Sequence, residues 1–287
     1  MRYNIVDDIK TVCALLEMSE GELSNELGVA RSTIHRIVSG RTYPNEKLLS
    51  EFYDYAYWNR YRSIRLNQLK VQFAKDSYQN ILFHGAKGEI TGKINLDHAR
   101  NDIDFGIGFY LGESYDQASS YIFKDQKSSV YIFDACELKR LKTIEFDVSF
   151  DWMIAVCYYR GQIDEYKDSK IVKSIIDKIN NCDVIIAPIA DNNMYEVMNQ
   201  FARGLITDVQ AKYALSASNL GKQHVLKTKK ACEAIKMVDR LYLCGRERFD
   251  IEYKNKQEMI NAYDKNRLAI EKYRREGKYI EELLNDK

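Results

Sequence analysis

Apolar residues in the first quarter of the chain recur at helical spacing. A helix is expected to begin at Ser19-Glu20-Gly21-Glu22, a capping box in which a serine precedes a glutamate by three positions. A second helix is expected over residues 31–38, with its apolar side chains on one face and polar and basic side chains elsewhere. Helical spacing continues from residue 44 to residue 75. The sequence therefore predicts an all-α domain with a basic connector over residues 1–75.

Beyond residue 78 the pattern changes to short apolar runs bounded by Gly, Asp, Asn and Pro, which is typical of strands. The predicted class is α+β, with this larger domain over residues 76–249 and a charged helical tail over residues 250–287. The tail has three open alternatives: packing on the core, covering the active site, or pairing with a second subunit. Strands are expected at 81–83, 109–111, 130–133 and 183–188, and helices at 115–122, 170–180 and 228–236.

Composition excludes several classes of protein. The six cysteines are scattered without a Cys-x-x-Cys pair, which indicates reduced thiols and no zinc site. No apolar run approaches the length of a transmembrane helix, and residues 1–8 lack the features of a signal peptide. Glycine-rich nucleotide loops and the motifs that accompany Asp-Phe-Gly in kinases are absent. We therefore expect a cytoplasmic protein with no metal and no membrane partner.

The net charge of +1 suggests no particular partner, but the charge is unevenly distributed. Residues 1–29 contain 2 basic and 6 acidic residues, a balance of −4. Residues 30–75 contain 9 basic and 3 acidic residues, a balance of +6. A basic stretch that coincides with a short polar helix favours contact with a phosphate backbone.

The run from Glu22 to Pro44 resembles the repressor-type (Xre-like) helix-turn-helix family. The resemblance implies that the start of the second helix enters the major groove of double-stranded DNA, while later arginines hold phosphates. Ala30 departs from the family, which usually has a capping serine there. The alternative is that these helices form a small module that contacts another protein rather than DNA. The expected DNA-binding residues are Arg31, Ser32, Thr33, His35, Arg36 and Arg41.

Three segments of the larger domain carry candidate chemistry. The first is His84-Gly85 at the end of a predicted strand, where a structural histidine is the alternative reading. The second is Asp104-Phe105-Gly106-Ile107-Gly108-Phe109-Tyr110-Leu111, whose glycines predict a tight bend and whose Tyr110 ring can stack on a flat ligand. The third is Leu220-Gly221-Lys222-Gln223-His224-Val225, late in the chain, which by itself indicates no particular chemistry.

Together with 182–192 and 203–206, these segments resemble a bacterial domain family of the ADP-ribosyltransferase superfamily, from about Ile81 to Leu243. The resemblance implies a central split antiparallel sheet and cleavage of NAD. It implies catalytic roles for His84, Tyr110 and Gln223. The expected NAD-binding residues are His84, Gly85, Arg100, Phe109, Tyr110 and Asp191, although Arg100 also fits a surface charge and Asp191 a solvated turn.

Gln223 stands where that branch of the superfamily has an acid. A carboxamide can hydrogen-bond a ribose hydroxyl, but it cannot act as a base and carries no charge to stabilise a developing cation. The leading expectation is a toxin or anti-phage mono-ADP-ribosyltransferase that forms a homodimer and modifies a nucleic acid or protein. An antitoxin protein is a candidate partner, whose existence the sequence leaves open. The alternatives are a transcription regulator that binds NAD without catalysis and an NAD hydrolase without a macromolecular acceptor.

Overall fold

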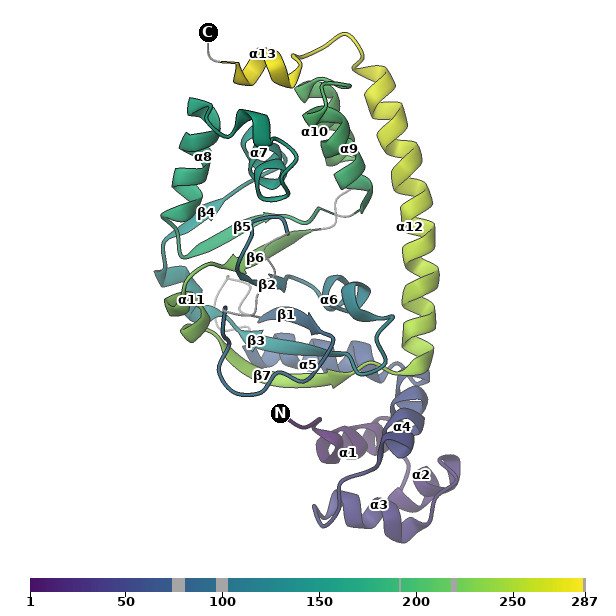
Figure 1. The fold of residues 1–287 in the computed structure, drawn as a ribbon. Coiled ribbons are helices and arrows are strands. Elements are labelled where there is room, and N and C mark those ends of the chain that lie inside the picture. The colour runs from purple at the N-terminus through teal and green to yellow at the C-terminus, as the bar shows by residue number, and fades with distance from the viewer. Residues whose placement is uncertain (74–80, 97–102, 191, 218–220, 286–287) are drawn as a thin grey trace. The chain divides into compact units, whose positions relative to one another are not determined.

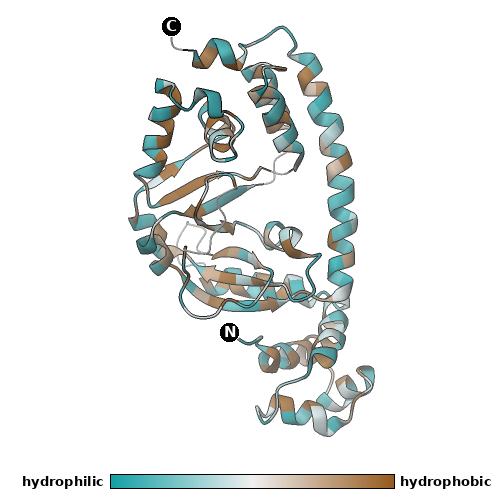
Figure 2. Cartoon of the chain, viewed as in Figure 1, coloured by the Kyte–Doolittle hydropathy of each residue, from teal (hydrophilic) through white to brown (hydrophobic). Residues whose placement is uncertain are grey.

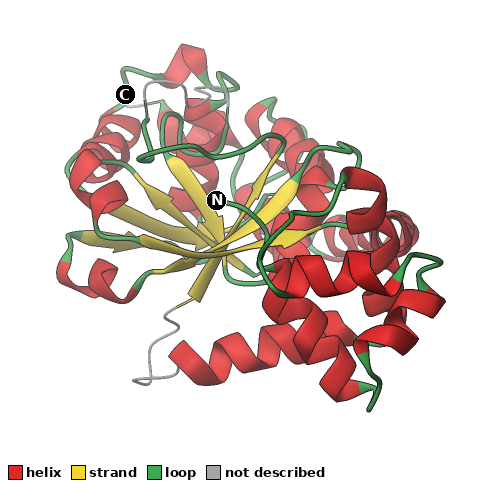
Figure 3. Cartoon of the chain, turned by 90° about the horizontal axis from the view of Figure 1, so that it is seen from below, coloured by secondary structure: helices red, strands yellow, loops and turns green. Residues whose placement is uncertain are grey.

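The computed structural model describes the chain of 287 residues apart from positions 74–80, 97–102, 191, 218–220 and 286–287. The chain folds into two compact units, each built from several stretches of sequence. The first unit holds residues 1–91, 118–134 and 237–253, and the second holds residues 92–117, 135–236 and 254–287. Both units contain helices and strands, which confirms the expected α+β class (Figure 3).

Five helices form the N-terminal part of the first unit. The predicted capping box is confirmed, because the Ser19 hydroxyl accepts from the Glu22 N–H at 3.2 Å and the Glu22 carboxylate accepts from the Ser19 N–H at 2.7 Å. The third helix follows Ala30, whose side chain caps nothing. The helices are α1 (Ile5–Leu15), α2 (Glu20–Glu26), α3 (Arg31–Val38), α4 (Glu46–Trp58) and α5 (Tyr61–Phe73).

These helices share one core with residues from much later in the chain. Tyr242 and Cys244 are buried among the apolar side chains of α1 to α5. The Arg62 side chain of α5 donates to the buried Glu247 carboxylate at 3.0 Å and also to the Tyr242 carbonyl. The helical part of the first unit is therefore bound to its C-terminal part through both apolar and charged contacts.

Three strands complete the first unit, in the order β1-β3-β7: β1 (Ile81–Ala86), β3 (Ser129–Asp134) and β7 (Lys236–Tyr242). β1 and β3 run antiparallel, with His84 opposite Tyr131. The helix expected over 228–236 is shorter than predicted, because α11 (Lys229–Glu233) ends before β7 begins. β7 is therefore not among the strands that the sequence predicts.

The strands of the second unit lie in the order β4-β5-β6-β2: β4 (Thr143–Glu145), β5 (Val184–Pro188), β6 (Lys222–Leu226) and β2 (Phe109–Gly112). The expected central antiparallel sheet is corrected to a mixed one: β5, β6 and β2 pair antiparallel, but β4 and β5 pair in parallel. The long connection between them contains α7 (Phe150–Tyr159) and α8 (Lys170–Asn180). Such a crossover allows two consecutive strands to run in the same direction.

Helices cover one side of this sheet and bury its apolar side chains. In Figure 1, α7, α8, α9 (Asn192–Ala202) and α10 (Asp208–Ser216) gather on one side of β5, whose ribbon is strongly apolar in Figure 2. Residues 152–157 of α7 are buried on every face of that helix. The remaining elements are α6 (Tyr115–Ile122), α12 (Gly245–Lys272), α13 (Ile280–Leu284) and the short helices η1 (Cys136–Arg140) and η2 (Asp164–Tyr166).

The end of the C-terminal tail packs on the second unit. Ile280 and Leu284 of α13 are buried in the same core as α7 and α8. The Gln210 side chain donates to the Ile270 carbonyl at 2.7 Å, and the rings of Tyr213 and Tyr273 stack with their centroids 3.8 Å apart. Of the three arrangements considered for the tail, these contacts support packing on the core.

Candidate functional site

The segment 104–108 forms the tight bend that its glycines predict. Gly106 has a φ of +65°, and its N–H donates to the Ile103 carbonyl at 2.9 Å. A Cβ at Gly106 would lie 2.8 Å from the Tyr159 ring, and one at Gly108 would lie 2.6 Å from Val225. Both glycines are thus required by backbone conformation or close packing.

Tyr110 and Gln223 lie on neighbouring strands and point to the same face of the sheet. β2 pairs antiparallel with β6, with Tyr110 opposite Val225 and Gly112 opposite Gln223. Because side chains alternate along a strand, residues 110, 112 and 223 share one face. The structure therefore brings these two predicted residues together, although they are more than a hundred positions apart in the sequence.

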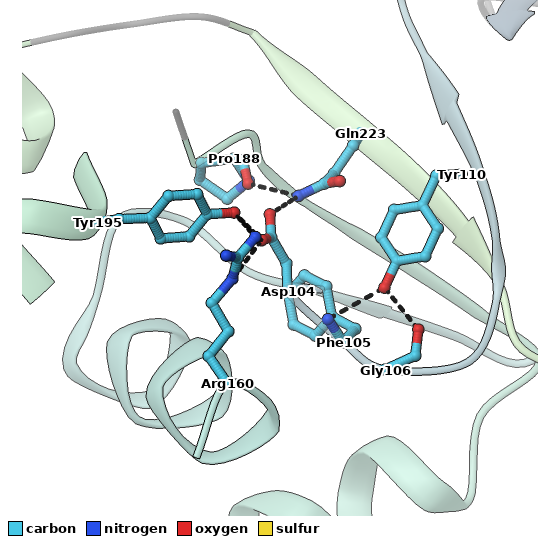
Figure 4. A network of polar contacts seen from close by, with 8 residues as sticks. All are labelled: Asp104, Phe105, Gly106, Tyr110, Arg160, Pro188, Tyr195 and Gln223. Atoms are coloured by element: carbon cyan, nitrogen blue, oxygen red, sulfur yellow. Dashed lines mark hydrogen bonds and ion pairs between the residues drawn. The ribbon is translucent and has the colours of Figure 1, made fainter. Parts of the chain in front are cut away.

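The Tyr110 side chain is held by the bend that precedes it. Its hydroxyl accepts from the Phe105 N–H at 3.1 Å and donates to the Gly106 carbonyl at 2.8 Å (Figure 4). Burial raises the pKa of the Tyr110 phenol far above its ordinary value, so the hydroxyl stays protonated. Its ring is fixed in place, and hydroxyl chemistry is not available to it at neutral pH.

Asp104 is the centre of the polar network around Gln223 (Figure 4). Its side chain is only 7% exposed, yet it receives hydrogen bonds from three other side chains. Gln223 Nε2 donates to Asp104 Oδ2 at 2.7 Å and to the Pro188 carbonyl at 3.1 Å. Arg160 Nη2 and the Tyr195 hydroxyl both donate to Asp104 Oδ1, the former at 3.0 Å. Donors thus compensate the buried carboxylate on both of its oxygens.

Arg160 and Tyr195 reinforce each other in this network. The Arg160 guanidinium lies 3.4 Å from the Tyr195 ring centroid, which is a cation–π contact. Burial and the neighbouring Asp104 raise the pKa of Tyr195, so its hydroxyl remains a donor. Neither residue could be predicted from the sequence, because Arg160 lies just after α7 and Tyr195 lies in α9, elements without a recognised motif.

Lys227, directly after β6, is another residue that the sequence analysis missed. Its ammonium donates to the carbonyls of Phe105 and Ile107, at 2.5 Å and 2.6 Å, and therefore fastens the bend to β6. Burial lowers the pKa of Lys227 to about 8. Gln223 therefore lies on the strand that ends just before Lys227, and Lys227 holds the bend that positions Tyr110.

His84 and Gly85 lie at the end of β1, in the first unit, whereas Tyr110 and Gln223 belong to the second. The His84 side chain is half-buried. A Cβ at Gly85 would lie 2.3 Å from the Ala118 carbonyl oxygen, so close packing against α6 requires glycine there. This packing explains Gly85 without any ligand.

Of the three remaining expected NAD-binding residues, one lies among the described residues and two do not. Phe109 is half-buried at the start of β2, opposite Leu226. Arg100 and Asp191 lie outside the described residues. Residues 192 and 193, which follow the expected turn at Asp191, belong to α9.

Most of the residues expected to contact DNA are accessible to solvent. Thr33 is half-buried, and the other five side chains are exposed. Ile34 and Ile37 are buried in the core on the opposite side of α3. His35 also faces Glu20 of α2, with Nδ1 3.4 Å from the carboxylate. The amphipathic character predicted for this helix is thus confirmed.

The described part of the chain contains no cluster of three or more His, Cys, Asp or Glu side chains able to hold a metal ion. Within the same residues, no helix is both long enough and apolar enough to cross a bilayer. The six cysteines are free thiols, four of them buried.

Residues 80–237, more than half of the chain, match the model of a family described as "Protein of unknown function (DUF3990)". Searches of curated proteins and of solved structures gave no match. The matched range contains the bend, the Asp104 network and the strands that carry Tyr110 and Gln223.

Proposed function

The chain belongs to the DUF3990 family, and we propose that it is a mono-ADP-ribosyltransferase that uses NAD as its substrate and carries its own DNA-binding domain. The observation that carries the proposal is the pairing of Tyr110 and Gln223 on one face of adjacent strands, each held by hydrogen bonds. A fixed aromatic ring beside a fixed carboxamide suits a planar nicotinamide next to a ribose hydroxyl.

In this proposal the residues bind and orient NAD rather than attack it. Tyr110 stacks on the nicotinamide, and Gln223 hydrogen-bonds the nicotinamide-ribose hydroxyl. The family resemblance assigns the ribose and the amide to His84 and Gly85. The bond between the ribose C1′ and the nicotinamide nitrogen breaks, and neutral nicotinamide leaves with the electron pair. The acceptor then forms a bond to C1′ and loses a proton.

The proposed DNA-binding surface consists of the exposed side chains of α3 together with Arg41. Arg31, Ser32 and Thr33 are at the start of α3, where a repressor-type helix reads base edges. Such a domain either represses the protein's own promoter or delivers the enzyme to a nucleic-acid acceptor. Because repressor-type domains act on paired half-sites, the proposal includes a homodimer.

A regulator that binds NAD without cleaving it is the second candidate function. The observation that favours it is the uncharged Gln223, whose amide nitrogen already donates to Asp104 and Pro188. A neutral carboxamide stabilises a developing positive charge less than a carboxylate does. In that case NAD binding would change the affinity of the protein for DNA, and no ADP-ribose would be transferred.

The test incubates purified protein with labelled NAD and, separately, duplex DNA, single-stranded DNA, RNA or protein extract. His84→Ala and Gln223→Ala are compared with Lys47→Ala, a matched control at an exposed lysine. Label on one acceptor class that is lost in both site variants supports the transferase. Nicotinamide release without a labelled acceptor indicates an NAD hydrolase, and NAD binding without release indicates the regulator.

A further inference from the structure

The amide of Gln223 is held in one orientation by its surroundings. A primary amide has two N–H groups, and Gln223 Nε2 has two acceptors, Asp104 Oδ2 at 2.7 Å and the Pro188 carbonyl at 3.1 Å. A flipped amide would bring Gln223 Oε1 against both of these acceptors. The side chain is only 7% exposed, so water cannot relieve that conflict easily.

The orientation leaves Gln223 Oε1 as the atom that can meet a ligand. Among the described residues, the hydrogen bonds of this side chain all run through Nε2, and in Figure 4 the oxygen points away from Asp104. An amide oxygen accepts hydrogen bonds and never donates them. A ligand group that binds there must therefore be a donor, such as a hydroxyl.

Asp104 is itself fixed from its other oxygen. Arg160 Nη2 donates to Oδ1 at 3.0 Å, the Tyr195 hydroxyl donates to the same atom, and the guanidinium stacks on the Tyr195 ring. Oδ2 is thereby directed toward Gln223. The four side chains form one chain of donor-to-acceptor contacts in which each atom has a single suitable role.

We propose that Asp104, held by Arg160 and Tyr195, is a positioning residue that orients Gln223 so that Oε1 accepts a hydrogen bond from a ribose hydroxyl of NAD. The same geometry requires a carboxamide at position 223, because a glutamate there would place a second carboxylate about 2.7 Å from Asp104. The proposal rests on the proposed function only for the identity of the hydroxyl.

A charge exchange between the two positions tests this inference. Gln223→Glu places two carboxylates in contact, and one of them must bind a proton. In Asp104→Asn, the new amide can satisfy either Gln223 or the Arg160–Tyr195 side, but not both. The double variant D104N/Q223E restores the contact between the two positions. Its amide oxygen at position 104 accepts from Arg160 and Tyr195, and its amide nitrogen donates to the carboxylate at position 223.

Nicotinamide release is the first readout. Each single variant is expected to lower kcat on the order of 10- to 100-fold at pH 8, as expected when a buried hydrogen bond is replaced by a conflict. NAD affinity should change less than kcat. The double variant should be about fivefold or more faster than either single variant, although it loses the donor to the Pro188 carbonyl. Glu113→Gln, a carboxyl-to-amide change whose carboxylate contacts His224 on the opposite face of the sheet, serves as the matched control.

Thermal unfolding is the second readout, and it needs no enzymatic activity. In Gln223→Glu the shared proton raises a carboxyl pKa in the folded state, so the native state binds more protons than the unfolded state. The contribution of this proton to the free energy of unfolding is therefore present at low pH and is lost as the pH rises through that pKa. The melting temperature of Gln223→Glu should fall by roughly 3–6 °C more than that of the wild type between pH 5 and pH 8. D104N/Q223E should show no such extra fall.

The two readouts separate the possible failures. A wild-type protein that neither binds nor cleaves NAD refutes the proposed function, while the melting temperatures still test the Asp104–Gln223 contact. A double variant that is no more active than the single variants overturns the positioning role if the wild type is active. A Gln223→Glu variant as active and as stable as the wild type also overturns it. If Gln223→Glu does not fold, the activity of the double variant is compared with that of Asp104→Asn alone. Because the exchanged pair is again complementary, a double variant no more active than Asp104→Asn overturns the positioning role.

Discussion

Replacing Arg62 by methionine tests how strongly α5 is bound to the C-terminal part of the first unit. The Arg62 and Glu247 side chains are only 10% and 3% exposed, and Arg62 Nε lies 3.0 Å from Glu247 Oε1. The guanidinium also donates to the Tyr242 carbonyl. Methionine retains most of the apolar length of the arginine side chain but removes the charge and every donor.

The expected loss follows from the burial of the pair. Removing one partner of a buried ion pair leaves the other charge uncompensated in a low-dielectric environment, which costs about 3–5 kcal/mol. For a protein of this size, 1 kcal/mol corresponds to roughly 2–4 °C, so the melting temperature should fall by about 10 °C. By contrast, Lys47 and Glu51 form an exposed pair, with side chains 83% and 41% exposed. Such a helical pair contributes only about 0.3–0.5 kcal/mol.

Thermal and urea-induced unfolding, followed by circular dichroism, measure this difference between Arg62→Met and the control Lys47→Met. The double variant R62M/E247M, which removes both charges, should recover much of the loss because no unpaired charge remains. A loss below about 1 kcal/mol for Arg62→Met would refute the reasoning. So would a double variant less stable than Arg62→Met.

Three further predictions concern the helix α3, the proposed DNA-binding residues and the bend at residues 104–108. Ala30→Ser supplies the missing N-cap of α3 and should raise the free energy of unfolding by about 1 kcal/mol in chemical denaturation. Arg36→Ala/Arg41→Ala removes two proposed phosphate contacts, so the slope of log K against log salt should become about 2 units shallower in binding titrations; an unchanged slope would contradict the proposed roles. The native pKa of Lys227 is lowered to about 8, so the unfolded state binds more protons than the native state above that pH. The free energy of unfolding should therefore increase as the pH rises from 8 to about 10, and this increase should be absent in Lys227→Met.

Local physical rules determined much of the secondary structure from sequence alone. The predicted helices at 115–122 and 170–180 match α6 and α8 residue for residue. The amphipathic spacing of α8 places Val172, Ile175 and Ile179 on one buried face, which a period of 3.6 residues reveals directly. The capping box at Ser19 is likewise local, because its partners are three residues apart.

Elements that are buried on all sides, or that are very short, could not be predicted from these local rules. The α7 sequence is apolar along most of its length, so it has no clear polar face from which a period could be read. β4 has three residues, and β7 follows α11 after only two residues. The parallel pairing of β4 with β5 depends on how the chain crosses over through α7 and α8, which no local pattern encodes.

The candidate site was only partly visible in the sequence for the same reason. Tyr110 and the glycines of the bend could be selected from one short segment, whereas Gln223 was selected only through the resemblance to a known family. Asp104 and Gln223 are 119 positions apart, and Arg160 and Tyr195 come from two further elements. Hydrogen bonds between such residues form only when the sheet and the helices of the second unit have packed. The sequence thus determined which local elements and candidate side chains exist, whereas the tertiary structure decided which polar atoms face one another in the buried site.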